Sequence, residues 1–105
     1  MYRKQDLRQT LHRLMNELLE ENGVEIYGDF KIEVADMDTL AFIKGSKIYV
    51  NTKASKYPLY VLKYIIAHEI AHLAVKGHTR KFWETVKHVY PEYEKGKQEL
   101  LRRLP

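Results

Sequence analysis

Residues 64–83 read YIIAHEIAHLAVKGHTRKFW, and this stretch predicts both a buried helix and a metal site. His68 and His72 are four residues apart, so a helix places both imidazoles on one face, one turn apart. Two imidazoles in that arrangement can bind a single metal ion, and Glu69 lies beside them. This is the H-E-x-x-H signature of zinc hydrolases, in which the glutamate acts as general base on a zinc-bound water.

The flanking residues indicate that this helix is buried on nearly all sides. Apolar residues dominate positions 59–75, Pro58 suits a first helical turn, and Gly77 suits a stop. Burying a glutamate and two histidines without partners would be costly, and a metal ion removes that cost. The alternative is a pair of hydrogen-bonded core histidines beside an ion-paired glutamate. Charged groups tolerate burial poorly, so we favour the metal site.

Composition limits the classes of protein that the chain can represent. Its 105 residues suit one domain with little room for accessories, and the absence of cysteine excludes disulfides and thiolate ligands. The polar N-terminus and the lack of a long apolar run predict a cytoplasmic protein without a membrane partner. The net charge is +4, and residues 76–105 hold the whole excess, with eight basic and four acidic side chains. We interpret this excess as a solvated helical surface rather than a nucleic-acid patch.

The N-terminal half predicts one helix followed by a small sheet. Residues 3–22 carry an apolar stripe at helical spacing, closed by Asn22-Gly23, while His12 lies off the stripe and receives no role. Three strands are expected, at Phe30–Val34, Leu40–Ile43 and Ile48–Val50. Gly45 fits the first central position of a two-residue type II′ turn between the last two strands. We expect the three strands to form a small antiparallel sheet.

The C-terminal third predicts two helical segments. Thr79 can cap a helix of about ten residues, and Pro91 breaks it and can open a last helix from Glu92 to Leu104. The predicted fold class is therefore α+β, a single domain with one core. It combines an N-terminal helix, a small antiparallel-rich sheet, the metal helix and two C-terminal helical segments.

The third metal ligand is predicted to be His78. A catalytic zinc usually has three protein ligands and keeps one position for water. His78 follows His72 by six residues and comes directly after Gly77, where the chain can turn back toward the metal. Metzincins share this histidine spacing, but they have glycine where this chain has Val75. They also need a methionine turn after the third ligand. All three methionines lie upstream, which argues against that class.

The run HEIAHLAVKGHTRKFW, with Pro91-Glu92-Tyr93 shortly after it, resembles the YgjP-like and WLM branch of zinc metallopeptidases. In size and layout the chain is most similar to the minigluzincins, which in turn are similar to the catalytic domains of HtpX-type membrane peptidases. The close match covers Ile65–Tyr93, and residues 1–57 match mainly in pattern and length. The resemblance implies a zincin-like fold, a Zn²⁺ cofactor held by His68, His72 and His78, and hydrolysis of peptides or unfolded proteins.

The resemblance also implies how substrate binds and how activity is restrained. An edge strand that binds extended substrate falls on Leu40–Lys44. The resemblance implies a latent form in which the C-terminal segment 92–105 blocks the site. The blockade occurs within one chain or by exchange of the segment in a homodimer. Glu99 or the Pro105 carboxylate could occupy the position of the water on zinc. The leucines at 100, 101 and 104 could fill substrate pockets, and periodicity equally allows them to pack onto the core. For the extra Tyr or His that steadies the oxyanion in larger relatives, the candidates are His88, Tyr90 and Tyr93.

Two other functions remain open at this point. The same H-x3-H-x5-H spacing occurs in metal-dependent endoribonucleases that mature ribosomal RNA, and the basic C-terminal third suits such a substrate. Against this, glycine usually follows the first histidine in that family, whereas this chain has Glu69. The second is a non-catalytic, zinc-stabilised binding module, which needs a fourth protein ligand such as Glu99, His88 or the C-terminal carboxylate.

Overall fold

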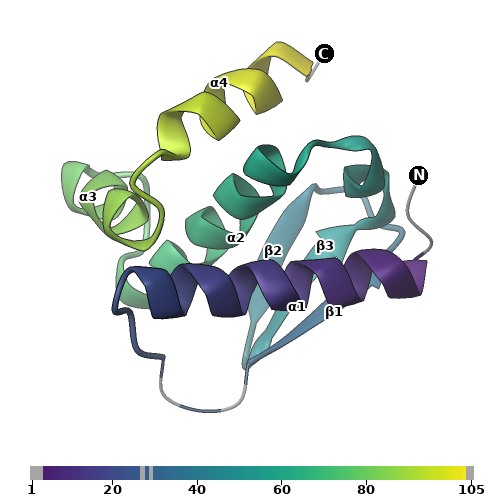
Figure 1. The fold of residues 1–105 in the computed structure, drawn as a ribbon, viewed down its shortest axis with the longest axis horizontal. Coiled ribbons are helices and arrows are strands. Elements are labelled where there is room, and N and C mark those ends of the chain that lie inside the picture. Colours follow the sequence, from purple (N-terminus) through teal and green to yellow (C-terminus); the bar gives the residue numbers. More distant parts are fainter. Residues whose placement is uncertain (1–3, 27, 29, 104–105) are drawn as a thin grey trace.

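The structure, a computed structural model, describes residues 4–26, 28 and 30–103 (Figure 1). The helix α1 is followed by three strands, a short 3-10 helix and three further helices. The bounds are α1 (Lys4–Glu21), β1 (Lys31–Ala35), β2 (Ala41–Lys44), β3 (Lys47–Asn51), η1 (Thr52–Lys56), α2 (Leu59–Ala74), α3 (Arg80–Val89) and α4 (Tyr93–Arg103). The predicted α+β class is confirmed. None of the described helices is long and apolar enough to cross a membrane.

The sheet has the strand order β1-β3-β2. Strands β2 and β3 form the predicted antiparallel hairpin, and Gly45 in its two-residue loop has φ +61°, as a primed turn requires. Strand β1 pairs with β3 in parallel, so the expectation of an antiparallel sheet throughout is wrong for this pair. The segment after β1 must therefore pass the end of β3 to reach the opposite edge.

The buried Asn51 at the end of β3 explains this crossing. Its side-chain amide donates to the carbonyl oxygens of Met37 and Thr39, at 2.7 and 3.0 Å, and its backbone N–H donates to Leu40 at 2.8 Å. These bonds hold the segment between β1 and β2 across the end of β3. A buried amide needs such partners, and here the partners also determine the strand order.

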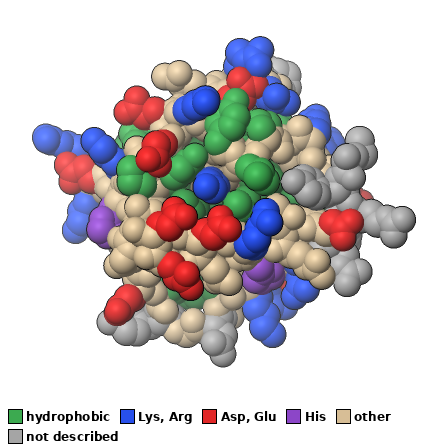
Figure 2. Space-filling view, viewed as in Figure 1, with side chains coloured by type: hydrophobic (Ala, Val, Ile, Leu, Met, Phe, Trp, Pro, Cys, Tyr) green, Lys and Arg blue, Asp and Glu red, His purple; other side chains and the backbone are tan. Residues whose placement is uncertain are grey.

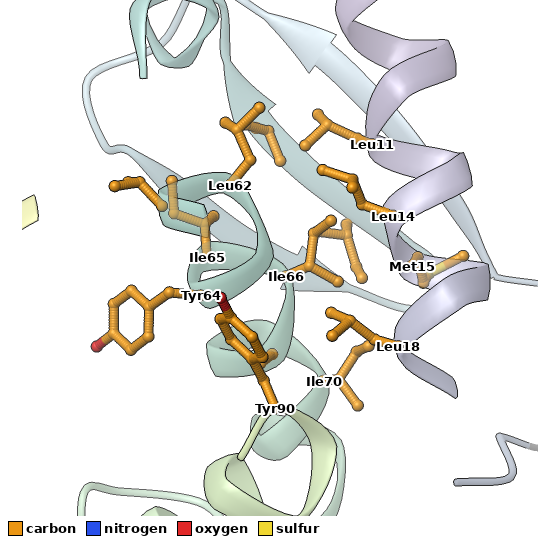
Figure 3. Packing of buried hydrophobic residues seen from close by; sticks show 14 of the residues in the cluster. Leu11, Leu14, Met15, Leu18, Leu62, Tyr64, Ile65, Ile66, Ile70 and Tyr90 are labelled. Carbon is orange, nitrogen blue, oxygen red and sulfur yellow. The ribbon is translucent and has the colours of Figure 1, made fainter. Parts of the chain in front are cut away.

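The core lies between the sheet and the two long helices. Helix α1 packs its apolar stripe against α2, as Figure 3 shows for Leu11, Leu14, Met15 and Leu18 facing Leu62, Ile66 and Ile70. The sheet contributes Ile32, Val34, Ile48 and Val50, which are all buried. In Figure 2 acidic and basic side chains both surround a group of hydrophobic side chains, so no patch of one sign covers the viewed face.

The free edge of β1 is capped by side chains of α1. The His12 ring accepts through Nε2 from the backbone N–H of Ile32 at 3.1 Å, and its Nδ1 donates to the Arg8 carbonyl at 2.9 Å. Arg8 Nε donates to the Ile32 carbonyl at 3.0 Å. Both backbone groups of Ile32 that face outward are thus satisfied. His12 therefore has a structural role that its sequence context did not indicate.

Replacing His12 with alanine is expected to lower the free energy of unfolding by about 1–3 kcal/mol, because the partly buried Ile32 N–H loses its acceptor. Urea denaturation of the two proteins measures the difference. His88→Ala, at an exposed position on α3, is the matched control and should change stability by less than about 0.5 kcal/mol. Equal losses in the two variants would contradict the capping role of His12.

Candidate metal centre

Three histidines converge at the C-terminal end of α2. His68 and His72 project from successive turns of α2, and Gly77, with φ +79°, turns the chain so that His78 comes back to them. The ring centroids of His68 lie 4.8 Å from His72 and 5.2 Å from His78, and the last two are 5.1 Å apart. Within the described part of the chain, these residues are the one group of three potential metal ligands.

The spacing of the ring nitrogens fits a single small cation. His78 Nε2 lies 3.2 Å from His68 Nε2, and one nitrogen from each ring lies within 4.8 Å of the others. Two nitrogens bound to one tetrahedral zinc at about 2.0–2.1 Å are separated by about 3.3 Å. His68 and His72 are half-buried, while His78 is exposed, so the group opens toward solvent.

Glu69 is the buried acid of the site. It is 6 % exposed, and its Oε2 lies 3.0 Å from Nδ1 of His68. Donation from Nδ1 fixes the tautomer in which His68 Nε2 carries a lone pair, directed at His78. A carboxylate that orients a ligating imidazole in this way is a common feature of metal sites. Glu69 therefore orients the ring of His68 within the candidate metal site.

The electrostatics favour an uncharged His72. Burial is the largest cause that lowers the pKa of His72 below its ordinary value, and the neighbouring His68 and His78 lower it further. Glu69 acts in the opposite direction and does not reverse the shift. An imidazole must be neutral to bind a metal, so the surroundings of His72 prepare it for that role.

Aromatic side chains form the wall around the histidines. The ring of Phe82 is fully buried and lies 4.5–5.1 Å from the three imidazoles, measured between centroids. Trp83 lies 6.1 Å from His68 and 6.0 Å from His78. Both come from the first turn of α3, where the predicted cap is confirmed by the bond from Phe82 N to Thr79 Oγ1 at 3.3 Å. The cap thus positions the wall.

A cavity of about 190 Å³ adjoins His68 and Glu69. Its other walls come from β2, α2 and α4, and they are mostly apolar. The remaining lining residues are Leu40, Ala41, Tyr64, Ile65 and Leu100. The predicted substrate strand and the C-terminal helix therefore meet at the same cavity, beside the candidate base.

The structure separates the three candidates for an oxyanion donor. His88 borders a different cavity with Leu73, and Tyr90 is buried, with its pKa raised by that burial. Tyr93 stacks on Trp83 at 5.9 Å and on Tyr64 at 6.5 Å, so it lies next to the site.

Tyr64, a residue that the sequence pattern indicated only as core, lines the cavity itself. Burial is the main cause that raises the pKa of Tyr64 to about 12, and Tyr93 and Glu69 add to it. The phenol therefore keeps its proton and remains a hydrogen-bond donor at neutral pH. Figure 3 shows that Tyr64 points away from α1.

Glu99 of the C-terminal segment does not lie at the histidines, where it was a candidate to take the position of the water on zinc. The Glu99 carboxylate accepts from Arg102 Nε at 3.1 Å and from Arg103 Nε at 2.6 Å, so it is engaged within α4 rather than with the histidines. Leu100 is 7 % exposed and reaches the cavity, whereas Leu101 is 61 % exposed. Leu104 and Pro105 lie outside the described residues.

Two solved structures share the fold of this chain. The chain is similar in structure to the metallopeptidase zymogen abylysin of Pyrococcus abyssi. The TM-score is 0.74 at 19 % identity, over 90 % of this chain and 94 % of the other. The zymogen jannalysin of Methanocaldococcus jannaschii gives a TM-score of 0.73 at 20 % identity, over 91 % of each chain. At these identities the likeness shows a shared fold. No curated protein sequence matches the chain.

The amino-acid sequence identifies the protein family. The model of the YgjP-like metallopeptidase domain matches residues 1–103, which is nearly the whole chain. This match confirms the resemblance inferred from the histidine motif, and it identifies an enzyme that acts on peptides rather than a nuclease or a binding module. The protein therefore belongs to the YgjP-like metallopeptidase family.

Proposed function

We propose that this protein is a zinc-dependent endopeptidase in which His68, His72 and His78 hold the ion and Glu69 is the general base. One observation carries the proposal: three imidazoles converge beside a buried carboxylate that lines a cavity. Three neutral nitrogen ligands with an open fourth position suit catalytic zinc. Among the described residues no further histidine, aspartate or glutamate joins this group, which disfavours a closed structural site.

Zinc bound there would supply a Lewis acid and lower the pKa of a water molecule. Glu69 accepts a proton as the water oxygen attacks the peptide carbonyl carbon. It then donates that proton to the leaving nitrogen as the C–N bond breaks. His68 keeps its orientation through the Glu69 carboxylate at 3.0 Å. The protonated hydroxyl of Tyr64, at the cavity wall, is the proposed donor to the developing oxyanion.

The proposed substrate is an extended peptide or an unfolded protein segment lying along β2. This strand is at an edge of the sheet, and Ala41 and the preceding Leu40 border the cavity beside Glu69. An edge strand offers unpaired backbone groups to an added chain. A peptide bond bound there would therefore lie next to the histidines.

We also propose that α4 holds the enzyme in a latent state, acting on its own chain. Helix α4 approaches α2 closely at Gly96, where an added Cβ would meet the Tyr60 carbonyl oxygen at 2.5 Å. Four residues further along α4, Leu100 forms part of the cavity wall beside His68 and Glu69. Abylysin and jannalysin are both metallopeptidase zymogens, which supports the idea of latency.

The test of the function is cleavage of an unfolded protein by the full chain. Metal-free protein should be inactive, and activity should appear with about one equivalent of Zn²⁺ and disappear again with a chelator. Mass spectrometry of the products would show cleavage within the chain. A zinc-loaded protein that leaves every unfolded substrate intact, also after removal of α4, would contradict the proposal.

Latency predicts that opening the cavity raises activity. Leu100→Ala should increase kcat/KM for peptide hydrolysis by about tenfold or more, because the shorter side chain leaves room for substrate in the cavity that Leu100 lines. Leu101→Ala is the matched control, since Leu101 is mostly exposed on the same helix, and it should change nothing.

Removal of residues 97–105 should act in the same direction as Leu100→Ala and leave the zinc bound. Circular dichroism and zinc content must accompany the rates. If the shortened protein unfolds or loses its metal, α4 is a core element and the latency proposal fails.

A further inference from the structure

Three lysines form one row across the sheet, at the end where the β2–β3 hairpin turns. Lys31 of β1 pairs with Lys47 of β3, and Lys47 pairs with Lys44 of β2. All three are exposed, and they lie on the face away from α1 and α2, because the next residues of β1 and β3, Ile32 and Ile48, are buried. Like charges directly opposite each other destabilise a sheet. Packing and pairing within the sheet therefore do not explain this row.

Within the described part of the chain, the positive charge of the row is not compensated. Glu33 of β1 lies one row further along the same face, and its carboxylate is 4.0 Å from Arg8 Nε. Among the residues that the structure describes, no carboxylate lies within ion-pair distance of the three lysine amines. The row is therefore suited to an acidic partner from outside the fold.

An aromatic pair occupies the row with Glu33, next to the lysines. Phe42 of β2 and Tyr49 of β3 are cross-strand partners, and their rings stack at 4.8 Å with 15° between the planes. Phe42 is 39 % exposed although it is a large apolar side chain. The outer face of β2 thus presents an aromatic ring at 42 and a positive charge at 44, two residues apart.

The outer edge of β2 is open to an added strand. Leu40 and Asn51 form a hydrogen-bonded pair, so the antiparallel alternation directs the backbone groups of Ala41 and Ile43 away from β3. No hydrogen bond from elsewhere in the described chain reaches these groups. The opposite edge differs, because Arg8 and His12 cap Ile32 of β1.

An antiparallel chain added at β2 would meet Phe42 and Lys44 at close range. Backbone bonds would form to Ala41 and Ile43, so positions 42 and 44 would be non-hydrogen-bonded pairs, in which opposing side chains come closest. Ala41 borders the cavity at Glu69, and Lys44 is at the far end of the strand. The added chain would therefore pass Lys44 first, then Phe42, and then reach the metal centre.

We infer that β2 selects substrates with an acidic residue opposite Lys44 and an aromatic or large apolar residue opposite Phe42. Read from N- to C-terminus, the preferred substrate has an acidic residue, then any residue, then an apolar residue. All three precede the cleaved bond. Lys47 and Lys31 strengthen the attraction for the acid. This inference deepens the proposed peptidase function and rests on it.

The test is a cleavage profile of the zinc-loaded full chain on a complex peptide mixture, read by mass spectrometry. Cleavage sites should be enriched in an acid two residues before an apolar residue. Two peptides that differ only in an acidic residue or a lysine opposite Lys44 should differ in kcat/KM by about fivefold, with the acidic peptide cleaved faster. This is the effect of an opposite-charge cross-strand pair. Added salt should reduce this difference, because the pair is exposed.

Three variants separate the possible outcomes. Lys44→Glu should reverse the charge preference, and Phe42→Ala should remove the apolar one. Lys87→Glu, at an exposed lysine of α3, is the control and should keep both. Cleavage without an acidic preference, or a preference that Lys44→Glu leaves unchanged, overturns the inference while the peptidase stands.

Two further outcomes would also overturn it. Binding of a single-stranded RNA oligonucleotide that Lys44→Glu abolishes, with the peptide preference unchanged, would assign the lysine row to nucleic acid. Absence of any cleavage in the mixture, both by the full chain and by the more active Leu100→Ala variant, would contradict the peptidase itself, and the inference with it.

Discussion

Replacing Glu69 with glutamine is expected to lower kcat/KM for peptide hydrolysis by about 100- to 10,000-fold, the usual contribution of a positioned general base. The amide is close in size to the carboxylate, so it fills the same buried place beside His68, but it cannot accept the proton of the attacking water. Zinc content, measured by metal analysis, and the circular dichroism spectrum should stay close to those of the unchanged protein. The loss is then one of chemistry rather than of folding.

The control for this variant is Glu84→Gln. Glu84 lies on the surface of α3, where it pairs with Arg80 at 3.3 Å, and its side chain is 65 % exposed. Its replacement should leave hydrolysis unchanged. Undiminished activity in a verified Glu69→Gln preparation would remove Glu69 from the mechanism.

Replacing a single histidine of the site should cost more than about 100-fold in zinc affinity, since loss of a supporting partner alone costs 10- to 100-fold. His78→Ala is the most informative change, because His78 is exposed and lies outside α2. The fold should therefore remain, while one of the three nitrogens is lost. Competition with a chromophoric chelator measures the affinity.

His88→Ala provides the matched control for the ligand variants. His88 is an exposed histidine on α3 that borders a different cavity, so its replacement should leave zinc affinity unchanged. If His78→Ala keeps one full equivalent of zinc at unchanged affinity, His78 is not the third ligand.

The sequence alone was sufficient for the parts of the site that depend on local geometry. The four-residue spacing of His68 and His72 defines one helix face, and Gly77 marks the turn that returns His78 to it. The hairpin at Gly45 and the cap at Thr79 likewise follow from short-range chemistry that individual residues determine. These features needed no knowledge of the distant parts of the chain.

Features that depend on long-range contacts were not accessible in this way. The parallel pairing of β1 depends on Asn51, whose amide reaches 12 to 14 residues back to Thr39 and Met37. His12 reaches across 20 residues to cap Ile32. A polar residue in a sequence pattern does not reveal which distant backbone group it will satisfy, so both roles required the structure.

The identity of the cavity wall was also beyond sequence reasoning. Tyr64 and Leu100 carry the apolar pattern of ordinary core residues, yet they lie on different helices and face one cavity. Gly96 allows those two helices to approach closely. In the sequence, a glycine inside a predicted helix indicates only a residue of low helix propensity. How closely two helices approach each other depends on the side chains of both. A sequence pattern describes each helix on its own.

The most direct measurement of the central claim is anomalous X-ray scattering at the zinc absorption edge from crystals of the full chain. We predict one zinc peak at about 2.0–2.1 Å from one nitrogen of each of His68, His72 and His78, with no protein side chain as the fourth ligand. A zinc ion closed by a fourth side chain would indicate a structural site. A peak away from these histidines, or no zinc in protein purified with zinc present, would contradict the account.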